Sequence, residues 1–148
     1  MRPQLMGSPE KIQALQALPA VLEPLRGAGR RIVLCHGVFD LLHVGHIRHL
    51  QRARAEGDVL VVTVTPDRWV NKGPSRPAFG HDLRLEALAA LDCIDYVALN
   101  EWPTAVETIA LLRPDVYVKG GEYRDEERDV TGGIRREREA VEAVGGRM

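Results

Sequence analysis

The sequence predicts an α/β fold in which a parallel β-sheet is covered by helices. Short apolar runs of four to six residues alternate with longer stretches whose apolar residues recur at helical spacing. Such alternation is typical of βαβ units with right-handed crossovers. The length of 148 residues favours one domain over two. Hydrophobic residues make up 45% of the chain and charged residues 28%, as in ordinary globular proteins.

An N-terminal helical segment is predicted over residues 1–29. Ser8 and Pro9 are residue types preferred at the N-cap and at the first helical position. Apolar residues then recur at helical spacing, at Ile12, Leu15, Leu18, Leu22 and Leu25. Pro19 is expected to kink or divide this segment, and Gly27 to end it.

Four strands and four further helices are predicted after this segment. The strands are expected over residues 31–36, 59–64, 96–99 and 116–118, and the helices over residues 45–55, 82–91, 104–113 and 134–144. Each strand is a short apolar run, as in a buried parallel sheet. Asp82 is a suitable N-cap, Thr104 and Glu107 have the spacing of a capping box, and Pro114 ends the helix before it.

Polar and glycine-containing segments follow every predicted strand. They are Gly37–Asp40, Pro66–Arg68, Asn100–Trp102 and Gly120–Glu122. The carboxyl ends of parallel strands lie at one edge of a sheet, and open α/β sheets bind their ligands at that edge. The sequence therefore predicts a ligand site formed by these segments.

The composition argues against several classes of partner. A net charge of −1 gives no electrostatic reason to expect nucleic acid or a membrane surface. No apolar run is long enough to span a bilayer, and residues 1–7 lack the apolar core of a signal peptide. Cys35 and Cys93 lie beside apolar residues, which favours two buried thiols over a disulfide. We therefore expect a cytoplasmic protein with no nucleic-acid or membrane partner.

The residues that point most directly to chemistry form the run GVFDLLHVGH, residues 37–46. His43 and His46 flank Gly45 at the predicted start of a helix, where unpaired N–H groups and the helix dipole favour anions. Two imidazoles beside such a site can donate hydrogen bonds to phosphate oxygens, as phosphoryl or nucleotidyl transfer requires. Two alternatives remain open: a metal site that also uses His36 and His49, and a purely structural role.

The same run resembles the signature of the cytidylyltransferase-like nucleotidyltransferases, a superfamily with a Rossmann-like α/β fold. The resemblance extends over residues 31–148. Within the superfamily the chain is most similar to the adenylyltransferase half of bifunctional heptose 7-phosphate kinase/heptose 1-phosphate adenylyltransferases, through Lys72–Pro77, Arg84 and Lys119–Tyr123. It also resembles glycerol-3-phosphate cytidylyltransferases, in which a Trp follows the third strand, as Trp102 does here.

This resemblance implies a role for each matching position. The catalytic residues would be His43, His46 and Lys72; the nucleotide would be bound by Gly37, Val38, Phe39, Gly45, Lys119 and Gly120; and the phosphate of the acceptor would be held by Arg84, Arg76 and Trp102. Mg²⁺ would bind through the triphosphate, with Asp40 as the one candidate side-chain ligand. Other interpretations remain open: Arg84 pairing with an acid such as Glu86, Trp102 in the core, and Asp40 in a turn. The charged residues around Glu137 are expected to form a solvated helix face.

The implied reaction moves a nucleoside monophosphate from ATP or CTP to a sugar phosphate such as heptose 1-phosphate and releases pyrophosphate. One alternative is a cytidylyltransferase acting on glycerol 3-phosphate or another polyol phosphate, and another is a nucleotide-binding module with little activity. The superfamily has a further strand and helix after the last helix predicted here. Residues 30–148 are therefore expected to be a nucleotidyltransferase domain without them. A homodimer is expected, and a fusion to a sugar kinase domain in a longer parent chain is a further expectation. The free edge of its sheet is expected to be covered by a second copy.

Overall fold

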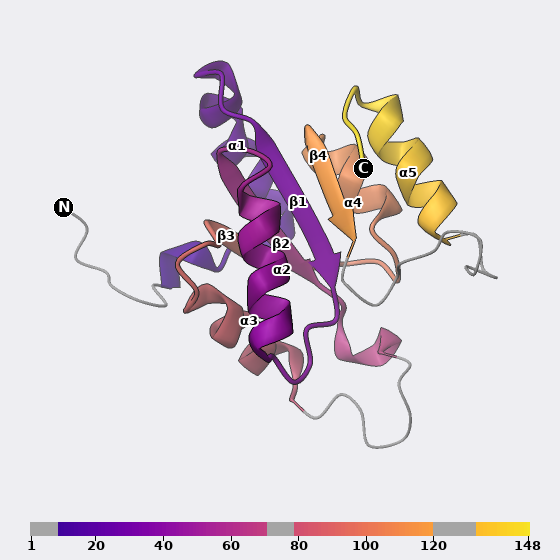
Figure 1. Ribbon diagram of the computed structural model, residues 1–148. Coiled ribbons are helices and arrows are strands. Elements are labelled where there is room, and N and C mark those ends of the chain that lie inside the picture. The colour runs from indigo at the N-terminus through magenta and orange to yellow at the C-terminus, as the bar shows by residue number, and fades with distance from the viewer. Residues whose placement is uncertain (1–8, 71–78, 120–132) are drawn as a thin grey trace.

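The sheet is parallel and has four strands. The computed structural model describes residues 9–70, 79–119 and 133–148 (Figure 1). Within these residues the strands are β1 (Ile32–Gly37), β2 (Val59–Val64), β3 (Tyr96–Leu99) and β4 (Val116–Lys119), in the order β3-β2-β1-β4. The helices are α1 (Leu18–Gly27), α2 (Val44–Arg54), α3 (His81–Ala89), α4 (Val106–Leu112) and α5 (Gly133–Ala143), and the short 3₁₀ turns are η1 (Pro9–Lys11), η2 (Leu15–Ala17) and η3 (Asp67–Trp69). The predicted α/β fold with a helix-covered parallel sheet is confirmed.

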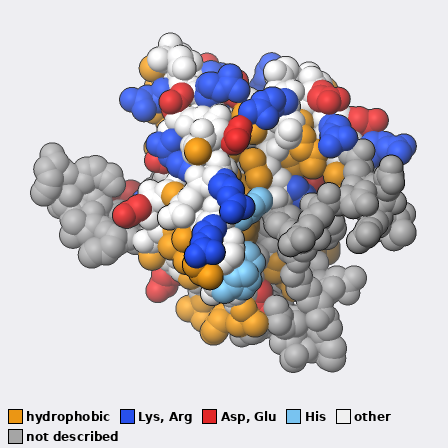
Figure 2. Space-filling view, in the orientation of Figure 1, with side chains coloured by type: hydrophobic (Ala, Val, Ile, Leu, Met, Phe, Trp, Pro, Cys, Tyr) orange, Lys and Arg blue, Asp and Glu red, His pale blue; other side chains and the backbone are white. Residues whose placement is uncertain are grey.

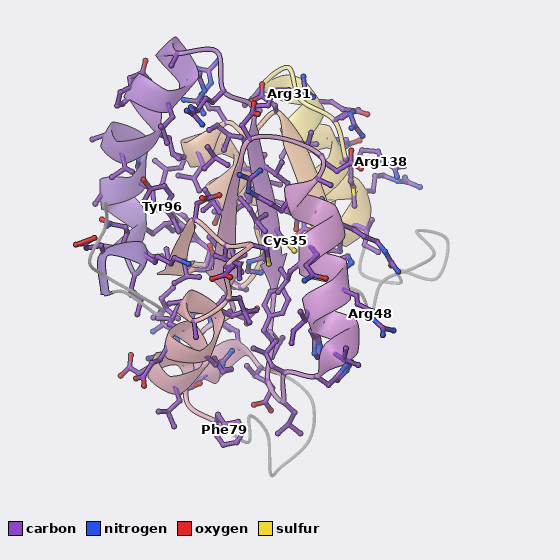
Figure 3. All side chains as sticks on the ribbon, turned by 60° about the vertical axis from the view of Figure 1, so that its left-hand side comes forward. Arg31, Cys35, Arg48, Phe79, Tyr96 and Arg138 are labelled. Atoms are coloured by element: carbon purple, nitrogen blue, oxygen red, sulfur yellow. The ribbon has the colours of Figure 1, made fainter. Side chains whose placement is uncertain are left out.

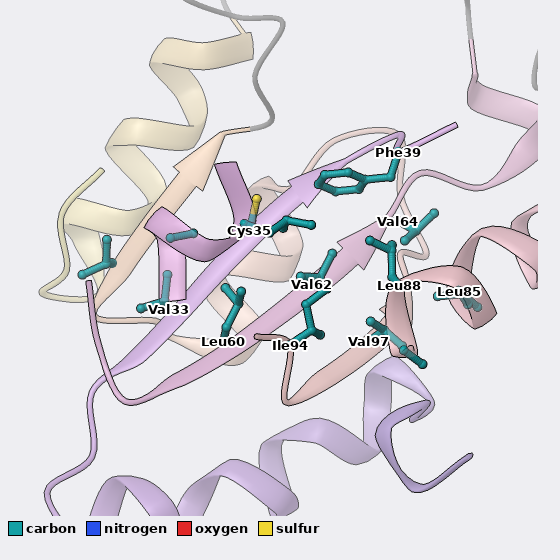
Figure 4. Close-up of a cluster of buried hydrophobic side chains, with 14 residues drawn as sticks. Val33, Cys35, Phe39, Leu60, Val62, Val64, Leu85, Leu88, Ile94 and Val97 are labelled. Atoms are coloured by element: carbon teal, nitrogen blue, oxygen red, sulfur yellow. The ribbon is translucent and has the colours of Figure 1, made fainter. Parts of the chain in front are cut away.

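Both faces of the sheet are buried, which explains why its strands are continuous apolar runs. Side chains alternate along each strand, so Val33 and Cys35 face one layer while Ile32 and Leu34 face the other. Figure 4 shows the first cluster, which packs between the sheet and the layer of α2 and α3. The second cluster packs against α1, α4 and α5. No helix in the described part of the chain is both long and apolar enough to cross a membrane.

The strand order reverses between β1 and β4. The chain passes from β1 to β2 and then β3 on one side, whereas β4 pairs with the opposite edge of β1. His36 and Lys119 are partners in the parallel register at the carboxyl ends of these two strands. Ligands of open α/β sheets bind at such a reversal, outside the carboxyl ends of the strands. The topology therefore points to the end of the β1–β4 boundary.

The N-terminal segment packs on the same sheet as the rest of the chain. Leu15, Leu18 and Leu22 are buried in the cluster that contains Leu34. Pro19 divides the segment as predicted, because η2 ends at residue 17 and α1 begins with Pro19 in its first turn. Ser8 lies outside the described residues. The division at residue 29 stays a prediction, although the two parts share one core.

Two predicted helix starts are wrong. Gly80, not Asp82, precedes α3, since the carbonyl of Gly80 already accepts the first helical hydrogen bond. Ala105, not Thr104, is the N-cap of α4, and no side chain caps that position. The hydroxyl of Thr104 accepts from the N–H of Val106 at 3.4 Å, and the N–H of Ala105 donates to a carboxylate of α5, that of Glu137, at 3.1 Å. Local sequence patterns could not reveal this tertiary contact.

After α5 the chain returns to the sheet beside β4. Gly145 has a φ of +87°, a conformation that glycine adopts readily, and it turns the backbone out of the helix. Arg147 then forms an isolated parallel bridge with Val116. The N–H of Tyr117 donates to the carbonyl of Arg147 at 2.8 Å, and the N–H of Arg147 donates to the carbonyl of Asp115 at 3.0 Å. The outer edge of β4 is thus paired at its amino end.

Candidate functional site

The candidate site lies at the N-terminus of α2, directly after the carboxyl end of β1. The helix has 11 residues and is preceded by the short loop that carries the histidine motif. Figure 2 shows histidine side chains gathered at one end of α2, with exposed hydrophobic side chains beside them. This end combines the reversal in strand order with the positive end of a helix dipole, so both features favour an anionic ligand.

His43 and His46 cap α2 reciprocally. His43 is the N-cap, and its Nδ1 accepts a hydrogen bond from the N–H of Gly45 at 3.0 Å. The Nδ1 of His46 accepts from the N–H of His43 at 3.2 Å. The ring centroids are 4.0 Å apart. Because each Nδ1 is an acceptor, the neutral rings carry their protons on Nε2, on the side away from these backbone contacts. The arrangement therefore supplies two adjacent N–H donors beside the helix N-terminus.

Gly45 is needed by the imidazole of His43. A Cβ built at Gly45 would lie 2.7 Å from Cε1 and 3.0 Å from Nδ1 of His43. No Cβ tolerates such a distance, so a side chain at residue 45 would displace the ring. The sequence predicted that this glycine serves the close approach of a nucleotide; the structure adds a reason within the protein itself.

The loop between β1 and α2 is held by Phe39. Its φ of 51° lies in the left-handed region, which is uncommon for a residue with a Cβ. The ring is buried, and a Cβ at Gly37 would approach its Cε2 to 2.9 Å, so Gly37 leaves room for it. The same ring meets His46 edge-on at a centroid distance of 5.9 Å. The ring of Phe39, for which Gly37 leaves room, thus packs against the histidine pair at His46.

Arg84 is buried beneath this loop, and its guanidinium donates four hydrogen bonds to protein acceptors. Its guanidinium donates to the carbonyls of Val38, Thr65 and Phe79 at 2.9, 2.8 and 3.1 Å. It also pairs with Asp67 at 2.6 Å, although its own side chain is only 1% exposed. Sequence reasoning named an acid on the surface, Glu86, as the alternative partner; the actual acid is Asp67. Arg84 therefore fixes Val38 and its loop.

The carboxylate of Asp40 joins the same structure. Asp40 is 4% exposed, and its Oδ1 accepts a hydrogen bond from the N–H of Phe79 at 3.0 Å. Phe79 itself is exposed beside the loop (Figure 3). This contact favours the turn interpretation of Asp40 over that of a metal ligand. Among the described residues, no group of three or more His, Cys, Asp or Glu side chains is placed to hold a metal ion.

The sequence suggested His36 only as a candidate metal ligand, and the structure gives it another role. Its Nδ1 lies 2.9 Å from Oγ1 of Thr63 and its Nε2 lies 3.4 Å from Oγ1 of Thr65. Burial, with a smaller contribution from the positive charge of Lys119, lowers the pKa of His36 to about 3. The ring is therefore neutral at physiological pH and links the ends of β1 and β2. In the sequence, the only sign of this link is that His36 and Thr63 are polar residues within apolar strands.

Lys119 lies at the opposite side of the boundary and is held by α5. Its Nζ is 2.9 Å from Oε1 of Glu137, whose side chain is 1% exposed. The prediction of a solvated helix face around Glu137 is wrong at this residue, because this face of α5 packs on β4. Its neighbour Arg138 is exposed, as the sequence suggested (Figure 3).

The other predicted site residues are Trp102, Lys72, Arg76 and Gly120. Trp102 is half-buried and packs against the second core cluster, which favours the core interpretation. Its carbonyl accepts a hydrogen bond from Nδ2 of Asn100. Lys72, Arg76 and Gly120 lie outside the described residues.

Comparisons with known proteins agree with this geometry. A family model described as cytidylyltransferase-like matches residues 34–146. Bifunctional protein HldE of Pelobacter propionicus is 45% identical over 143 residues, which is 95% of this chain and 28% of the relative. Bifunctional protein HldE of Aliarcobacter butzleri is 42% identical over 123 residues, which is 82% of this chain and 25% of the relative. The chain thus spans about a quarter of the length of the curated relatives that it matches.

A solved structure shares the fold. The crystal structure of the lipopolysaccharide core biosynthesis protein from Thermoplasma volcanium GSS1 is similar with a TM-score of 0.61 at 26% sequence identity. The similarity covers 81% of this chain and 93% of that one. Sequence, fold and the position of the histidine motif all lead to one assignment: the chain belongs to the cytidylyltransferase-like family.

Proposed function

We propose that this chain is a nucleotidyltransferase that transfers AMP from ATP to a heptose 1-phosphate and releases pyrophosphate. The observation that carries the proposal is the histidine pair that caps α2 through Nδ1 and carries its N–H groups on Nε2. The similarity to bifunctional HldE proteins over most of the chain supports the choice of heptose and of ATP.

In the proposed reaction an oxygen of the acceptor phosphate attacks the α-phosphorus of ATP. A new P–O bond forms there, the bond to the bridging oxygen between the α- and β-phosphorus breaks, and pyrophosphate leaves with that oxygen. Negative charge grows on the phosphate oxygens as the leaving group departs. Nε2–H groups of His43 and His46, with the N-terminus of α2, are preorganised to stabilise this charge.

The other residues serve the same site in distinct ways. Gly37, Phe39 and Gly45 shape the loop and the helix start, and Val38 is held there by Arg84. We propose Lys119 and Gly120 as the far wall of the nucleotide pocket and Lys72 as a cation beside the phosphates. Arg76 and Trp102 remain proposals for the acceptor side. Arg84 contributes through the loop, because its guanidinium is already occupied by protein acceptors.

Magnesium fits this site through the nucleotide. Members of the family generally use a divalent metal with the nucleoside triphosphate. Asp40, the one side chain considered as a ligand, is occupied by the N–H of Phe79 through one of its oxygens. We propose that Mg²⁺ is bound by oxygens of the triphosphate, where it would offset charge on the leaving pyrophosphate.

Four exposed hydrophobic side chains bear on the assembly of the protein. Leu41, Val44, Phe79 and Leu83 are large hydrophobic side chains with 43–59% of their surface exposed. Exposed apolar side chains near one another favour an interface, and we propose a homodimer, with a kinase domain in a longer parent chain as in bifunctional relatives. We propose the cytoplasm as location, because nucleoside triphosphates are its substrates.

The test is a matrix of pyrophosphate-release assays. ATP and CTP are each combined with heptose 1-phosphate, heptose 7-phosphate or glycerol 3-phosphate, with Mg²⁺ present. The proposal expects the highest kcat/KM for ATP with heptose 1-phosphate. A preference for CTP with glycerol 3-phosphate would establish the alternative cytidylyltransferase, and nucleotide binding without pyrophosphate release would indicate a binding module.

A further inference from the structure

Glu137 is a buried carboxylate that accepts hydrogen bonds from three donors, two in β4 and one at the start of α4. It lies within α5, and its side chain is 1% exposed. Its Oε1 accepts from the hydroxyl of Tyr117 at 3.0 Å and from Nζ of Lys119 at 2.9 Å, and its Oε2 accepts from the N–H of Ala105 at 3.1 Å. A buried carboxylate is costly unless such partners satisfy it. Both oxygens are satisfied here, so its position is fixed.

Lys119 is consequently held at both of its ends. The N–H on Nε2 of His49 donates to the carbonyl of Lys119 at 3.0 Å, from α2. Glu137 holds the ammonium of the same residue from α5. His49 lies one helical turn after His46, so the helix that carries the histidine pair also fixes the backbone of Lys119.

The position of Lys119 gives this double attachment a function. Lys119 is the last residue of β4 and the register partner of His36 at the strand-order reversal. Its side chain is 17% exposed, in contrast to that of Glu137, so the ammonium lies on the solvent side of the ion pair. Its charge reaches His36, whose pKa it helps to lower. A cation here adds to the field that attracts a polyanion to the edge of the sheet.

We propose that Glu137 is a positioning residue for nucleotide binding, whose carboxylate holds the Lys119 ammonium at the end of the β1–β4 boundary. The proposal rests on the proposed function, because it assumes that the nucleotide binds at this edge. Glu137 does not contact the nucleotide and acts only through Lys119. Its contribution must therefore disappear when the ammonium of Lys119 is removed.

A double-mutant cycle measures this dependence. The dissociation constant of ATP with Mg²⁺ is determined by calorimetry for wild type, Glu137→Gln, Lys119→Met and the double variant. Gln retains an acceptor oxygen for Tyr117 or Ala105 but loses the charge. Each single change is expected to weaken ATP about tenfold, and the double variant is expected to match Lys119→Met alone. Tyr117→Phe is the control, since it removes one hydrogen bond to Glu137 and leaves the ion pair; it should change ATP affinity less than about twofold.

The outcomes separate this proposal from the one on which it rests. A wild-type protein that binds neither ATP nor CTP would contradict the proposed function. If Lys119→Met weakens ATP but Glu137→Gln leaves its affinity unchanged or increases it, only the positioning role is overturned. An effect of Glu137→Gln that persists in the Lys119→Met background also overturns it, because Glu137 would then act by another route.

Two further measurements remain decisive if Glu137→Gln does not fold. Glu137→Asp keeps the charge on a shorter side chain. Its loss of ATP affinity should be larger than that of Tyr117→Phe and smaller than that of Lys119→Met. Lysine-selective ¹⁵N NMR on wild type follows Nζ directly, since Lys11 and Lys72 are the only other lysines in the chain. The Nζ signal of Lys119 should shift when ATP saturates the protein, and an unchanged signal would overturn the proposal.

Discussion

Nδ1 of His46 accepts a hydrogen bond from the backbone N–H of His43, at 3.2 Å. The two motif histidines are therefore linked before any ligand binds, and one residue both caps the helix and presents a donor. This dual role allows structure and catalysis to be tested separately at a single position.

Replacement of His46 distinguishes the two roles. His46→Ala removes the cap and the Nε2–H donor, and we expect turnover to fall about 10²–10³-fold, as when one preorganised donor is deleted. Stability should fall by about 1 kcal/mol, as for a lost helix cap. His46→Gln can restore the cap, because Gln at this position completes a capping box. Urea unfolding should show that His46→Gln regains the stability lost in His46→Ala, whereas the pyrophosphate assay should show that it does not regain turnover. Near-normal turnover of His46→Ala would argue against a catalytic His46.

Gly45→Ala tests why this position lacks a side chain. The added Cβ would collide with the ring of His43, so we expect weaker ATP binding measured by calorimetry. The control is the same change in a His43→Ala background, where the ring is absent. Little further loss in that background is expected if the collision with His43 is the cause. An equal loss in both backgrounds would show that the nucleotide itself needs the space.

Arg84 is expected to affect stability more than acceptor recognition. Arg84→Met removes the donors for three carbonyls and leaves Asp67 without its partner. An acceptor left buried without its donor costs about 1–3 kcal/mol, so the loss of donors for three carbonyls should lower the urea midpoint strongly. Asp67→Asn is the milder control, since the Asp67 side chain is 41% exposed. A variant of normal stability with a selectively raised KM for the sugar phosphate would instead support direct binding by Arg84.

The lowered pKa of His36 is expected to make the folded protein less stable in acid. Burial and the charge of Lys119 lower its pKa from the ordinary 6.5 to about 3 in the folded protein. Because the unfolded chain binds the proton more readily, stability from this residue is present above pH 6.5 and is lost as the pH falls toward 3. The slope from one such group approaches about 1.4 kcal/mol per pH unit.

The measurement for His36 is urea unfolding as a function of pH. His36→Asn should remove this contribution to the slope, whereas His43→Asn, at an exposed position, should retain it. An unchanged slope in His36→Asn would show that other groups dominate acid unfolding.

Removal of divalent metal should affect catalysis and leave the fold intact. The proposed Mg²⁺ enters with the triphosphate, so EDTA should abolish pyrophosphate release while the Tm of the nucleotide-free protein stays the same. A marked fall in Tm, or stoichiometric zinc by elemental analysis, would instead indicate a structural metal site.

Sequence patterns predicted the strands and the histidine motif because these depend on local order. The apolar run Val59–Val64 predicts a buried strand, and its predicted bounds are those of β2. The position of His43 and His46 at a helix start also follows from the chain immediately around them. That four loops share one edge follows from parallel strands alone.

Features that depend on tertiary contacts could not be predicted in the same way. Glu137 lies among charged residues, and only the packing of α5 on β4 buries it. Arg84 looks like an available cation until its carbonyl partners, one of them 46 residues away, are brought together. The hydrogen bond from the N–H of Ala105, at the start of α4, to Glu137 has the same origin.

The most direct test of the account is the identity of the products formed from ATP, Mg²⁺ and heptose 1-phosphate. Mass spectrometry of the reaction should find one product with the mass of AMP joined to heptose 1-phosphate, together with an equal amount of pyrophosphate. That result requires attack at the α-phosphorus, as the site at the N-terminus of α2 is proposed to support. ADP as the nucleotide product would instead show attack at the γ-phosphorus and would contradict nucleotidyl transfer, as would the absence of any AMP-containing sugar product.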